Sequence, residues 1–256
     1  MRLYRILGVT ITDETFEAAV DHVRALVDGD GPRSLVFVNA HTLNHAAADP
    51  AFRDTLNAAS LVYGDGTGVR WAARLQGLRL RANLNGTDLI PAVLTRRPGV
   101  RCYLVGSAPD RIEAVVRTAR RLFPDVEFVG AHHGYLDSAA SRAVADDVRR
   151  SGANLVLVGM GNPIQERWVE AHRAAAPGAL FVAVGGFLEY WHGNLRRAPG
   201  FMRRAGLEWV HLMLRQPRKV PRYLLGNPLY LARVLRALPQ DRAFRQDRAE
   251  AAGERE

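Results

Sequence analysis

Short apolar runs alternate with longer amphipathic stretches along the first 190 residues of the chain. The apolar runs have the length of buried strands, and they cover residues 35–38, 61–63, 102–105, 126–129, 155–158 and 180–184. Helical spacing of apolar residues marks the stretches 14–27, 42–59, 67–76, 88–94, 111–123, 138–150 and 164–174. This alternation predicts an α/β fold with a Rossmann-like, mostly parallel sheet flanked by helices.

Glycine-bearing turns follow several of the predicted strands, at residues 64–68, 106–109, 159–163 and 185–186. In open α/β sheets, ligands bind beyond the carboxyl ends of the strands, where backbone N–H groups at helix starts can hold phosphate. We therefore expect a binding site at this edge that includes Gly106 and Gly161. Glycines also serve simply to turn a chain from a strand into a helix, and the turns alone do not separate these two interpretations.

The alternation ends near residue 190, which divides the chain into three predicted parts. Residues 1–195 form the α/β domain, and residues 196–240 form a basic, amphipathic appendage that associates with a membrane. Within the appendage, short helices are expected at residues 206–214 and 229–236, with a basic linker at residues 217–221 between them. The remaining residues, 241–256, are predicted to be a charged and disordered tail.

Composition places this chain among globular proteins of a reducing compartment. With 256 residues, of which 48% are hydrophobic and 24% charged, it can bury a substantial core. Its single cysteine, Cys102, lies in a predicted buried strand and has no second cysteine to pair with. The amino terminus lacks a secretory signal, and no apolar run approaches the roughly 20 residues of a membrane-spanning helix. A cytoplasmic location is therefore expected.

The formal net charge of +9 is concentrated in one segment. Residues 196–236 contain ten basic residues and one acid, so that the rest of the chain holds 25 basic and 25 acidic residues. Aromatic side chains, among them Trp209 and Tyr223, are interleaved with these arginines. Such a segment calls for an anionic partner, and the aromatics favour a surface of anionic lipid over a merely solvated face.

Asp65 is the strongest candidate for a catalytic base. It is flanked by glycines between a predicted strand and a predicted helix, where a carboxylate would reach the mouth of the sheet. Asp-Gly is also a common turn signal, and spacing alone favours the turn.

Two polar segments follow other strands. Asn39 and Thr42 can bind hydroxyl groups, although capping of a helix is the more frequent role for Thr42. His41 and His45 are four residues apart but have no visible third ligand, so no metal site is predicted. In residues 159–168 a dinucleotide-binding fingerprint is broken, because its third glycine is replaced by Ile164. Gln165 and Glu166 open the next helix, where they either contact substrate or cap the helix.

Taken in order, these segments resemble the WecG/TagA/CpsF glycosyltransferases over residues 35–225. The residues that carry the resemblance are Asn39 with Asp49-Pro50, Asp65-Gly66-Thr67-Gly68-Val69, Gly86-Thr87-Asp88-Leu89, Gly159, Gly161, Pro163, Gln165, Glu166, Arg197-Ala198-Pro199 and Leu207-Glu208-Trp209.

The resemblance implies an inverting glycosyl transfer that uses no metal or other cofactor. The implied donor is a UDP-sugar carrying N-acetylmannosamine, its uronic acid or another hexose, and the acceptor is a polyprenyl-diphosphate-linked saccharide. The implied setting is bacterial envelope, teichoic acid, capsule or exopolysaccharide synthesis at the inner face of the cell membrane, without nucleic acid and with homo-oligomer formation left open.

The family's proposed base falls on Asp65, and its substrate-binding glutamine falls on Gln165. Lys219 and Arg222 match its basic appendage. The remaining candidate binding residues are Asn39, Thr42, Gly66, Thr67, Asn83, Gly106, Gly161, Glu166 and Arg197.

Three positions depart from the family pattern: Phe37 stands where a threonine is common, and Asn83 and Leu212 stand where arginines are common. These departures bear on donor identity and phosphate contacts more than on the reaction class. Two other classes remain open from the residues alone. The glycine turns would suit a nucleotide-dependent oxidoreductase, and the arginine-aromatic segment would suit a non-catalytic module that binds anionic lipid or RNA.

Overall fold

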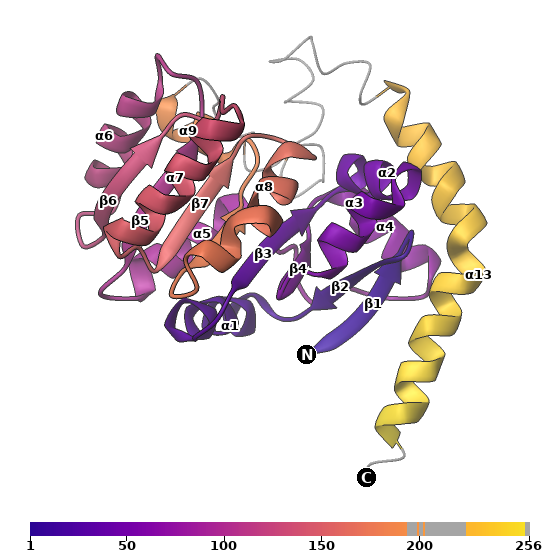
Figure 1. Cartoon of the computed structure of the whole chain (residues 1–256). Coiled ribbons are helices and arrows are strands. Elements are labelled where there is room, and N and C mark those ends of the chain that lie inside the picture. Colours follow the sequence, from indigo (N-terminus) through magenta and orange to yellow (C-terminus); the bar gives the residue numbers. More distant parts are fainter. Residues whose placement is uncertain (194–198, 200–201, 203–223, 254–256) are drawn as a thin grey trace.

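The computed structural model describes residues 1–193, 199, 202 and 224–253, and it contains one eight-stranded sheet (Figure 1). The strands lie in the order β1-β2-β4-β3-β8-β7-β5-β6, and all neighbours are parallel except β1 and β2. Their bounds are β1 Arg2–Ile6, β2 Val9–Asp13, β3 Arg33–Val38, β4 Leu61–Gly64, β5 Arg101–Gly106, β6 Glu127–His132, β7 Leu155–Gly159 and β8 Leu180–Ala183. The predicted α/β class and mostly parallel sheet are confirmed.

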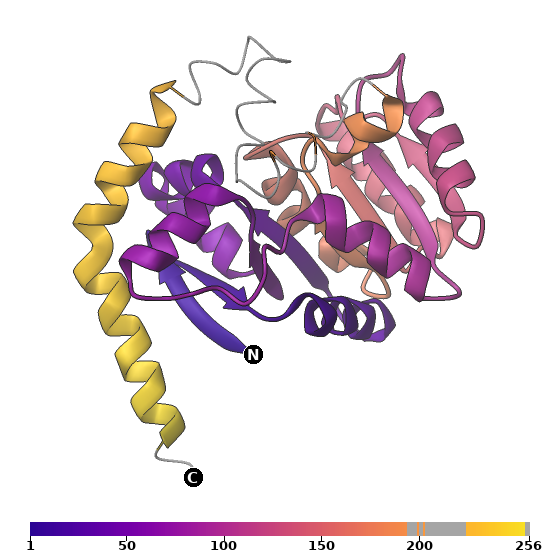
Figure 2. The same ribbon diagram turned by 180° about the vertical axis from the view of Figure 1, so that it is seen from behind.

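Helices cover both faces of the sheet, which is why its central strands are apolar on both sides. In β3, Leu35 and Phe37 face one core, whereas Val36 and Val38 face the other. The first face is covered by α1 (Phe16–Asp28), α5 (Gly86–Arg96), α6 (Ile112–Leu122) and α9 (Phe187–His192), and Figure 2 shows α1 in dark indigo on this side. The second face is covered by α2 (Ala40–Ala48), α3 (Pro50–Asn57), α4 (Thr67–Leu75), α7 (Ser138–Ser151) and α8 (Ile164–His172).

The amino terminus forms a β-hairpin that the apolar runs did not predict. Strands β1 and β2 are antiparallel, and they are joined by Leu7 and Gly8, whose φ angles are +52° and +80°. Two positive φ values suit the tight turn between twisted antiparallel strands. The hairpin extends the sheet beyond β4 at one edge, since Thr12 of β2 pairs with Tyr63 of β4.

The helix predicted over residues 42–59 is two helices, α2 and α3. The break comes at Asp49, whose side chain accepts a hydrogen bond from the Phe52 backbone N–H at 3.1 Å and so caps α3. Asn39 caps α2, and Thr42 is not the capping residue. The stretch breaks into two helices because Pro50 lacks a backbone N–H and therefore suits the first turn of a new helix.

The carboxyl-terminal segment also differs from its prediction. Helix α13 runs from Gly226 to Gly253, so the helix expected at residues 229–236 is part of a longer one that continues past residue 240. Asp241 is buried there and accepts a hydrogen bond from the Leu7 backbone N–H at 3.0 Å, a partner that exists only because of the hairpin. The predicted helix at 206–214 and the linker at 217–221 lie outside the described residues.

Helix α13 lies along the flank of the molecule beside β1, α2 and α4 (Figure 1). Tyr230 and Val234 project into the core that these elements share. The residues that follow each of them, Leu231 and Leu235, are exposed. The part of the predicted appendage that the structure describes is therefore docked on the α/β domain.

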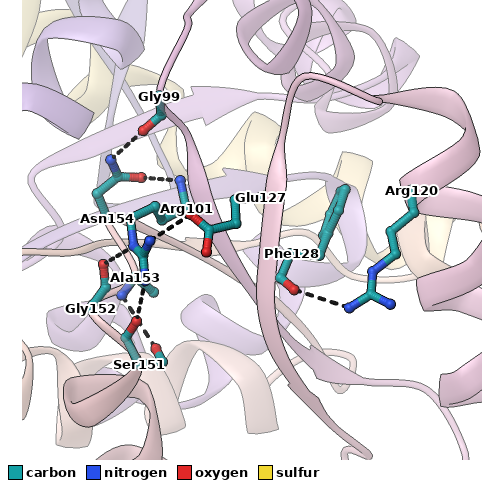
Figure 3. A network of polar contacts seen from close by, with 9 residues as sticks. All are labelled: Gly99, Arg101, Arg120, Glu127, Phe128, Ser151, Gly152, Ala153 and Asn154. Atoms are coloured by element: carbon teal, nitrogen blue, oxygen red, sulfur yellow. Dashed lines mark hydrogen bonds and ion pairs between the residues drawn. The ribbon is translucent and has the colours of Figure 1, made fainter.

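Polar contacts join the amino ends of β5 and β7 at the edge of the sheet opposite the glycine turns (Figure 3). The Asn154 side chain accepts from the Arg101 backbone N–H at 2.9 Å and donates to the Gly99 carbonyl oxygen at 3.1 Å. The Arg101 guanidinium donates to the carbonyl oxygens of Ser151 and Gly152, at 2.9 and 3.1 Å. These groups satisfy one another within the protein and tie the amino ends of β5 and β7 together.

Candidate active site

The carboxyl ends of five neighbouring strands bring the predicted site residues to one edge of the sheet. Val38 of β3 lies opposite Gly64 of β4, and Gly106 of β5 lies opposite Gly159 of β7. Between these pairs lies β8. The helices that follow β3 and β8 pack on opposite faces, as do those that follow β7 and β5. Crevices at such switch points are where open α/β sheets bind ligands.

Asp65 stands directly after β4 in a loop that is held by its backbone. The Asp65 N–H donates to the Val38 carbonyl oxygen at 2.8 Å, which ties the loop to the end of β3. Gly66 follows with a φ of +87°, a conformation that favours glycine, and the first turn of α4 begins at Thr67. Asp65 is therefore part of a turn, as its spacing suggested, and this turn presents it at the strand-end edge.

Two of the departures from the family pattern support the same region. The Asn83 side-chain oxygen accepts a hydrogen bond from the Gly66 backbone N–H at 3.1 Å. Phe37 packs against Gly86, where an added Cβ would come within 3.2 Å of the Phe37 ring. Asn83 thus fixes the loop that bears Asp65, and Phe37 fixes the start of α5. Leu212 lies outside the described residues.

Asn39 follows β3 and organises the start of α2. Its side-chain oxygen accepts from the backbone N–H groups of His41 and Thr42, at 3.0 and 3.2 Å, and from the Thr42 hydroxyl at 3.3 Å. Thr42 is fully buried, while Asn39 is partly exposed. Of these two candidates, Asn39 is therefore the one with surface at the edge. The His41 and His45 Nε2 atoms lie 3.3 Å apart, and within the described chain no third histidine, cysteine or acid joins them as a metal cluster.

Gln165 joins the loops that follow β7 and β8. Its side-chain oxygen accepts from the Gly161 backbone N–H at 3.1 Å and from the Gly185 backbone N–H at 3.0 Å. Its amide nitrogen donates to Glu166 Oε1 at 2.8 Å. Gln165 is only 1% exposed, so its buried side chain holds the two glycine loops together from beneath through these hydrogen bonds.

Glu166 is a buried carboxyl in the first turn of α8. Its Oε1 accepts from the side chains of Gln165 and Asn162, while Oε2 has no hydrogen-bond partner in the described part of the chain. Burial raises the pKa of Glu166 from its ordinary value, and the hydrogen bonds from Gln165 and Asn162 oppose this in part. Burial therefore disfavours the charged form of the Glu166 carboxyl behind the loop that follows β7.

Gly106 and Ser107 form the corresponding loop after β5. An added Cβ at Gly106 would lie 2.5 Å from the Gly159 carbonyl oxygen, so only glycine allows the two strand ends to approach. The Ser107 hydroxyl donates to Glu189 Oε1 at 2.9 Å, and Arg111 lies 3.4 Å from Glu189 Oε2. Sequence reasoning missed this Ser107–Glu189–Arg111 group, because Glu189 reaches it from α9, and only the packing of α9 against α6 brings these residues together.

The edge thus gathers the candidates Asp65, Gly66, Thr67, Asn83, Asn39, Gly106 and Gly161, with Thr42, Gln165 and Glu166 buried behind it. Asp65 and Gln165 follow strands three positions apart in the sheet, which is roughly 14 Å at the usual strand spacing. Arg197, Lys219 and Arg222 lie outside the described residues.

Comparisons with known proteins match nearly the whole chain. The model of the glycosyl transferase WecG/TagA/CpsF family matches residues 4–243. An N-acetylglucosaminyldiphosphoundecaprenol N-acetyl-beta-D-mannosaminyltransferase of Bacillus spizizenii is 30% identical over 239 residues, which are 92% of each chain. A protein of the same name from Staphylococcus aureus is 27% identical over 236 residues, covering 91% of this chain and 92% of its own.

Proposed function

Because the chain belongs to the WecG/TagA/CpsF family and is a glycosyltransferase, we propose that it transfers N-acetylmannosamine or a related sugar from a UDP-sugar to a polyprenyl-diphosphate-linked saccharide. Relatives that match nine-tenths of the chain are named for transfer of N-acetylmannosamine to N-acetylglucosaminyldiphosphoundecaprenol. The product would serve bacterial cell-envelope synthesis. The family match sets aside the oxidoreductase and the non-catalytic module that the residues alone left open.

The proposed reaction is a single displacement with Asp65 as general base. Its carboxylate takes the proton of the acceptor hydroxyl while that oxygen forms a bond to the anomeric carbon of the donor sugar. The bond from this carbon to the diphosphate oxygen breaks, and UDP leaves from the opposite face, so the anomeric configuration inverts. The observation that carries the proposal is the position of Asp65, held at the mouth of the sheet by the Val38 carbonyl oxygen and the Asn83 side chain.

The glycine loops after β7 and β8 suit the leaving diphosphate. Gln165 holds both loops through Gly161 and Gly185, so their backbones are fixed before a ligand arrives. Asp65 lies roughly 14 Å along the edge from the loop after β7. One extended donor would therefore have its diphosphate at the glycine loops after β7 and β8 and its reacting carbon at the Asp65 loop.

The flank formed by α4 and α13 supports peripheral binding to an anionic membrane at the inner face of the cell. A groove of about 330 Å³ is lined by Trp71, Arg74, Leu75 and Leu231. Trp71 is 53% exposed, and Leu231 and Leu235 are also exposed. Residues 66–87 contain four arginines and no acid, and residues 224–240 contain two arginines and no acid. Apolar side chains among cations are the pattern of a lipid-facing surface.

Among the described residues, no helix combines the length and the apolar character needed to cross a bilayer. In the proposed reaction the lipid-linked acceptor is met at the α4–α13 flank, because helix α4 connects this flank with the loop that bears Asp65.

The deciding experiment measures UDP release from a panel of UDP-sugars in the presence of a polyprenyl-diphosphate-N-acetylglucosamine acceptor. We expect UDP-N-acetylmannosamine to be turned over, and Asp65→Asn to lower kcat by about 10²- to 10⁴-fold, the usual contribution of a general base. Donor binding by Asp65→Asn, measured by calorimetry with UDP, should persist. Full activity of Asp65→Asn would remove Asp65 as the base, and no turnover of any UDP-sugar would remove the donor class.

A further inference from the structure

Tyr230 of α13 contacts the helix that follows the Asp65 loop. Its hydroxyl donates to the Gly68 carbonyl oxygen at 3.3 Å, and Gly68 lies in the first turn of α4, three residues after Asp65. A Cβ added to Gly68 would lie 3.4 Å from the Tyr230 ring and 3.0 Å from the Ala40 Cβ. The first turn of α4 is therefore pressed between the start of α2 and the ring of Tyr230.

Helix α13 is itself anchored on both sides of Tyr230, so the ring has a defined position. The Asn44 side chain donates to the Gly226 carbonyl oxygen at 2.8 Å, and the Arg233 guanidinium donates to the Asn44 carbonyl oxygen at 2.8 Å. Further along, Asp241 accepts from the Leu7 backbone N–H at 3.0 Å. Tyr230 is only 5% exposed and Val234, one turn later, is 1% exposed.

The Asp65 loop depends on such outside contacts because its own sequence is flexible. Three glycines, at positions 64, 66 and 68, surround Asp65 and Thr67, and α4 begins without a side-chain cap. Glycine loses more conformational freedom than any other residue when it is held in one place. Contacts from Val38, Asn83 and Tyr230 fix the backbone at Asp65, Gly66 and Gly68 respectively.

We propose that Tyr230 is a positioning residue: by holding Gly68, it sets the place of the α4 first turn and thereby of Asp65. Helix α13 then serves chemistry as well as docking, since Tyr230 faces the Asp65 loop while the next residue, Leu231, faces the α4–α13 groove. This inference rests on the proposed role of Asp65 as the base.

The test compares Tyr230→Ala and Tyr230→Phe with a matched control, Val234→Ala, in the full chain. Val234 lies on the same buried face of α13 and in the same core, so its truncation also creates a cavity. Hydrogen exchange of the amides of residues 64–70 reports on the loop without any substrate. We expect faster exchange in Tyr230→Ala, an intermediate effect in Tyr230→Phe, which keeps the ring, and wild-type exchange in Val234→Ala.

Kinetics then separates positioning from a general loss of stability. A water-soluble, short-chain polyprenyl-diphosphate-N-acetylglucosamine acceptor removes any dependence on membrane docking, and UDP-N-acetylmannosamine is the donor. Tyr230→Ala should lower kcat by about tenfold, as misplacement of a catalytic group does, with little change in donor KM. In the Asp65→Asn background, Tyr230→Ala should cause no further loss, because the base through which it acts is gone.

Equal exchange in the loops of Tyr230→Ala and Val234→Ala would overturn the proposal, as would equal effects of both substitutions on kcat. The proposal would also be overturned if Tyr230→Ala lowered kcat by the same factor in the Asp65→Asn background as in the wild type. If Asp65→Asn itself kept full activity, the proposed base would fall instead, and the exchange experiment would still decide whether Tyr230 holds the loop.

Discussion

Gln165 accepts a hydrogen bond from the Gly185 backbone N–H, which links the loop after β7 to the loop after β8 across neighbouring strands. The same oxygen accepts from Gly161, so one buried side chain sets the distance between two glycine turns. In the proposed reaction these turns receive the leaving diphosphate. Gln165 matches a substrate-binding residue of the family by sequence. In this structure its buried side chain supports the two glycine turns.

Gln165→Leu should therefore weaken both the fold and donor binding. Two backbone N–H groups would lose their acceptor, which costs about 1–3 kcal/mol for each group that remains buried. We expect a lower free energy of unfolding in urea and weaker UDP binding by calorimetry. Gln76→Leu is the matched control, because Gln76 is also buried but donates to the Arg5 carbonyl oxygen, away from the site. Equal loss of UDP binding in both variants would contradict a local role for Gln165.

Glu166→Gln tests the buried acid behind the same loop. Burial raises the pKa of Glu166 above its ordinary value of 4.5, so ionised Glu166 destabilises the folded state. The stabilising contribution of the protonated form is full below pH 4.5 and is lost as the pH rises through the raised pKa. Glutamine cannot ionise and imitates the protonated acid. We expect Glu166→Gln to gain stability over the wild type with rising pH, measured by urea unfolding from pH 4 to 8.

A constant difference between Glu166→Gln and the wild type over this range would show that Glu166 does not change its protonation on folding. Glu170→Gln provides a control on the same helix, because Glu170 is paired with Arg173 and is more exposed.

Trp71 and Leu231 should contribute to membrane binding through the α4–α13 groove. Replacing both with serine removes exposed apolar surface next to the arginines of α4. Since partial burial of each large apolar side chain is worth about 1–2 kcal/mol, we expect the double variant to bind vesicles that contain phosphatidylglycerol roughly 30- to 1,000-fold more weakly. Sedimentation with these vesicles measures this binding.

Leu122→Ser is the control, because Leu122 is 50% exposed on α6, at the far side of the sheet from α13 (Figure 1). Unchanged binding of the double variant would exclude this flank as the docking surface.

The sequence predicts the central strands well, because each is a short apolar run buried on both faces. The β1–β2 hairpin escapes prediction, since its turn places Leu7 at a positive φ instead of using an Asn-Gly or Asp-Gly pair. That omission has a consequence for α13. The hydrogen bond that Asp241 of this helix accepts from the Leu7 N–H cannot be foreseen without the hairpin.

The candidate site is predictable in part. Ordered motifs single out Asp65 and Gln165, and the sheet does bring their loops to one edge. What these side chains contact is not predictable, because it depends on which strands are neighbours. The hydrogen bond between Gln165 and the loop after β8 requires β7 to lie beside β8. The contact of Tyr230 with Gly68 joins residues that are 162 positions apart.

Asn83 offers a way to probe Asp65 without replacing it. Asn83→Asp keeps an oxygen that can accept from the Gly66 N–H, so the loop should hold its place, but it adds a negative charge beside the residue that follows Asp65. A nearby like charge disfavours ionisation and raises the pKa of the base. The acidic limb of the kcat/KM profile should therefore move to higher pH, and the displacement should shrink at high ionic strength because Asn83 is exposed. Asn83→Ala, which frees the Gly66 N–H without adding charge, should lower kcat and leave that limb in place. If Asn83→Asp and Asn83→Ala moved the acidic limb of the kcat/KM profile equally, that limb would not report the ionisation of Asp65.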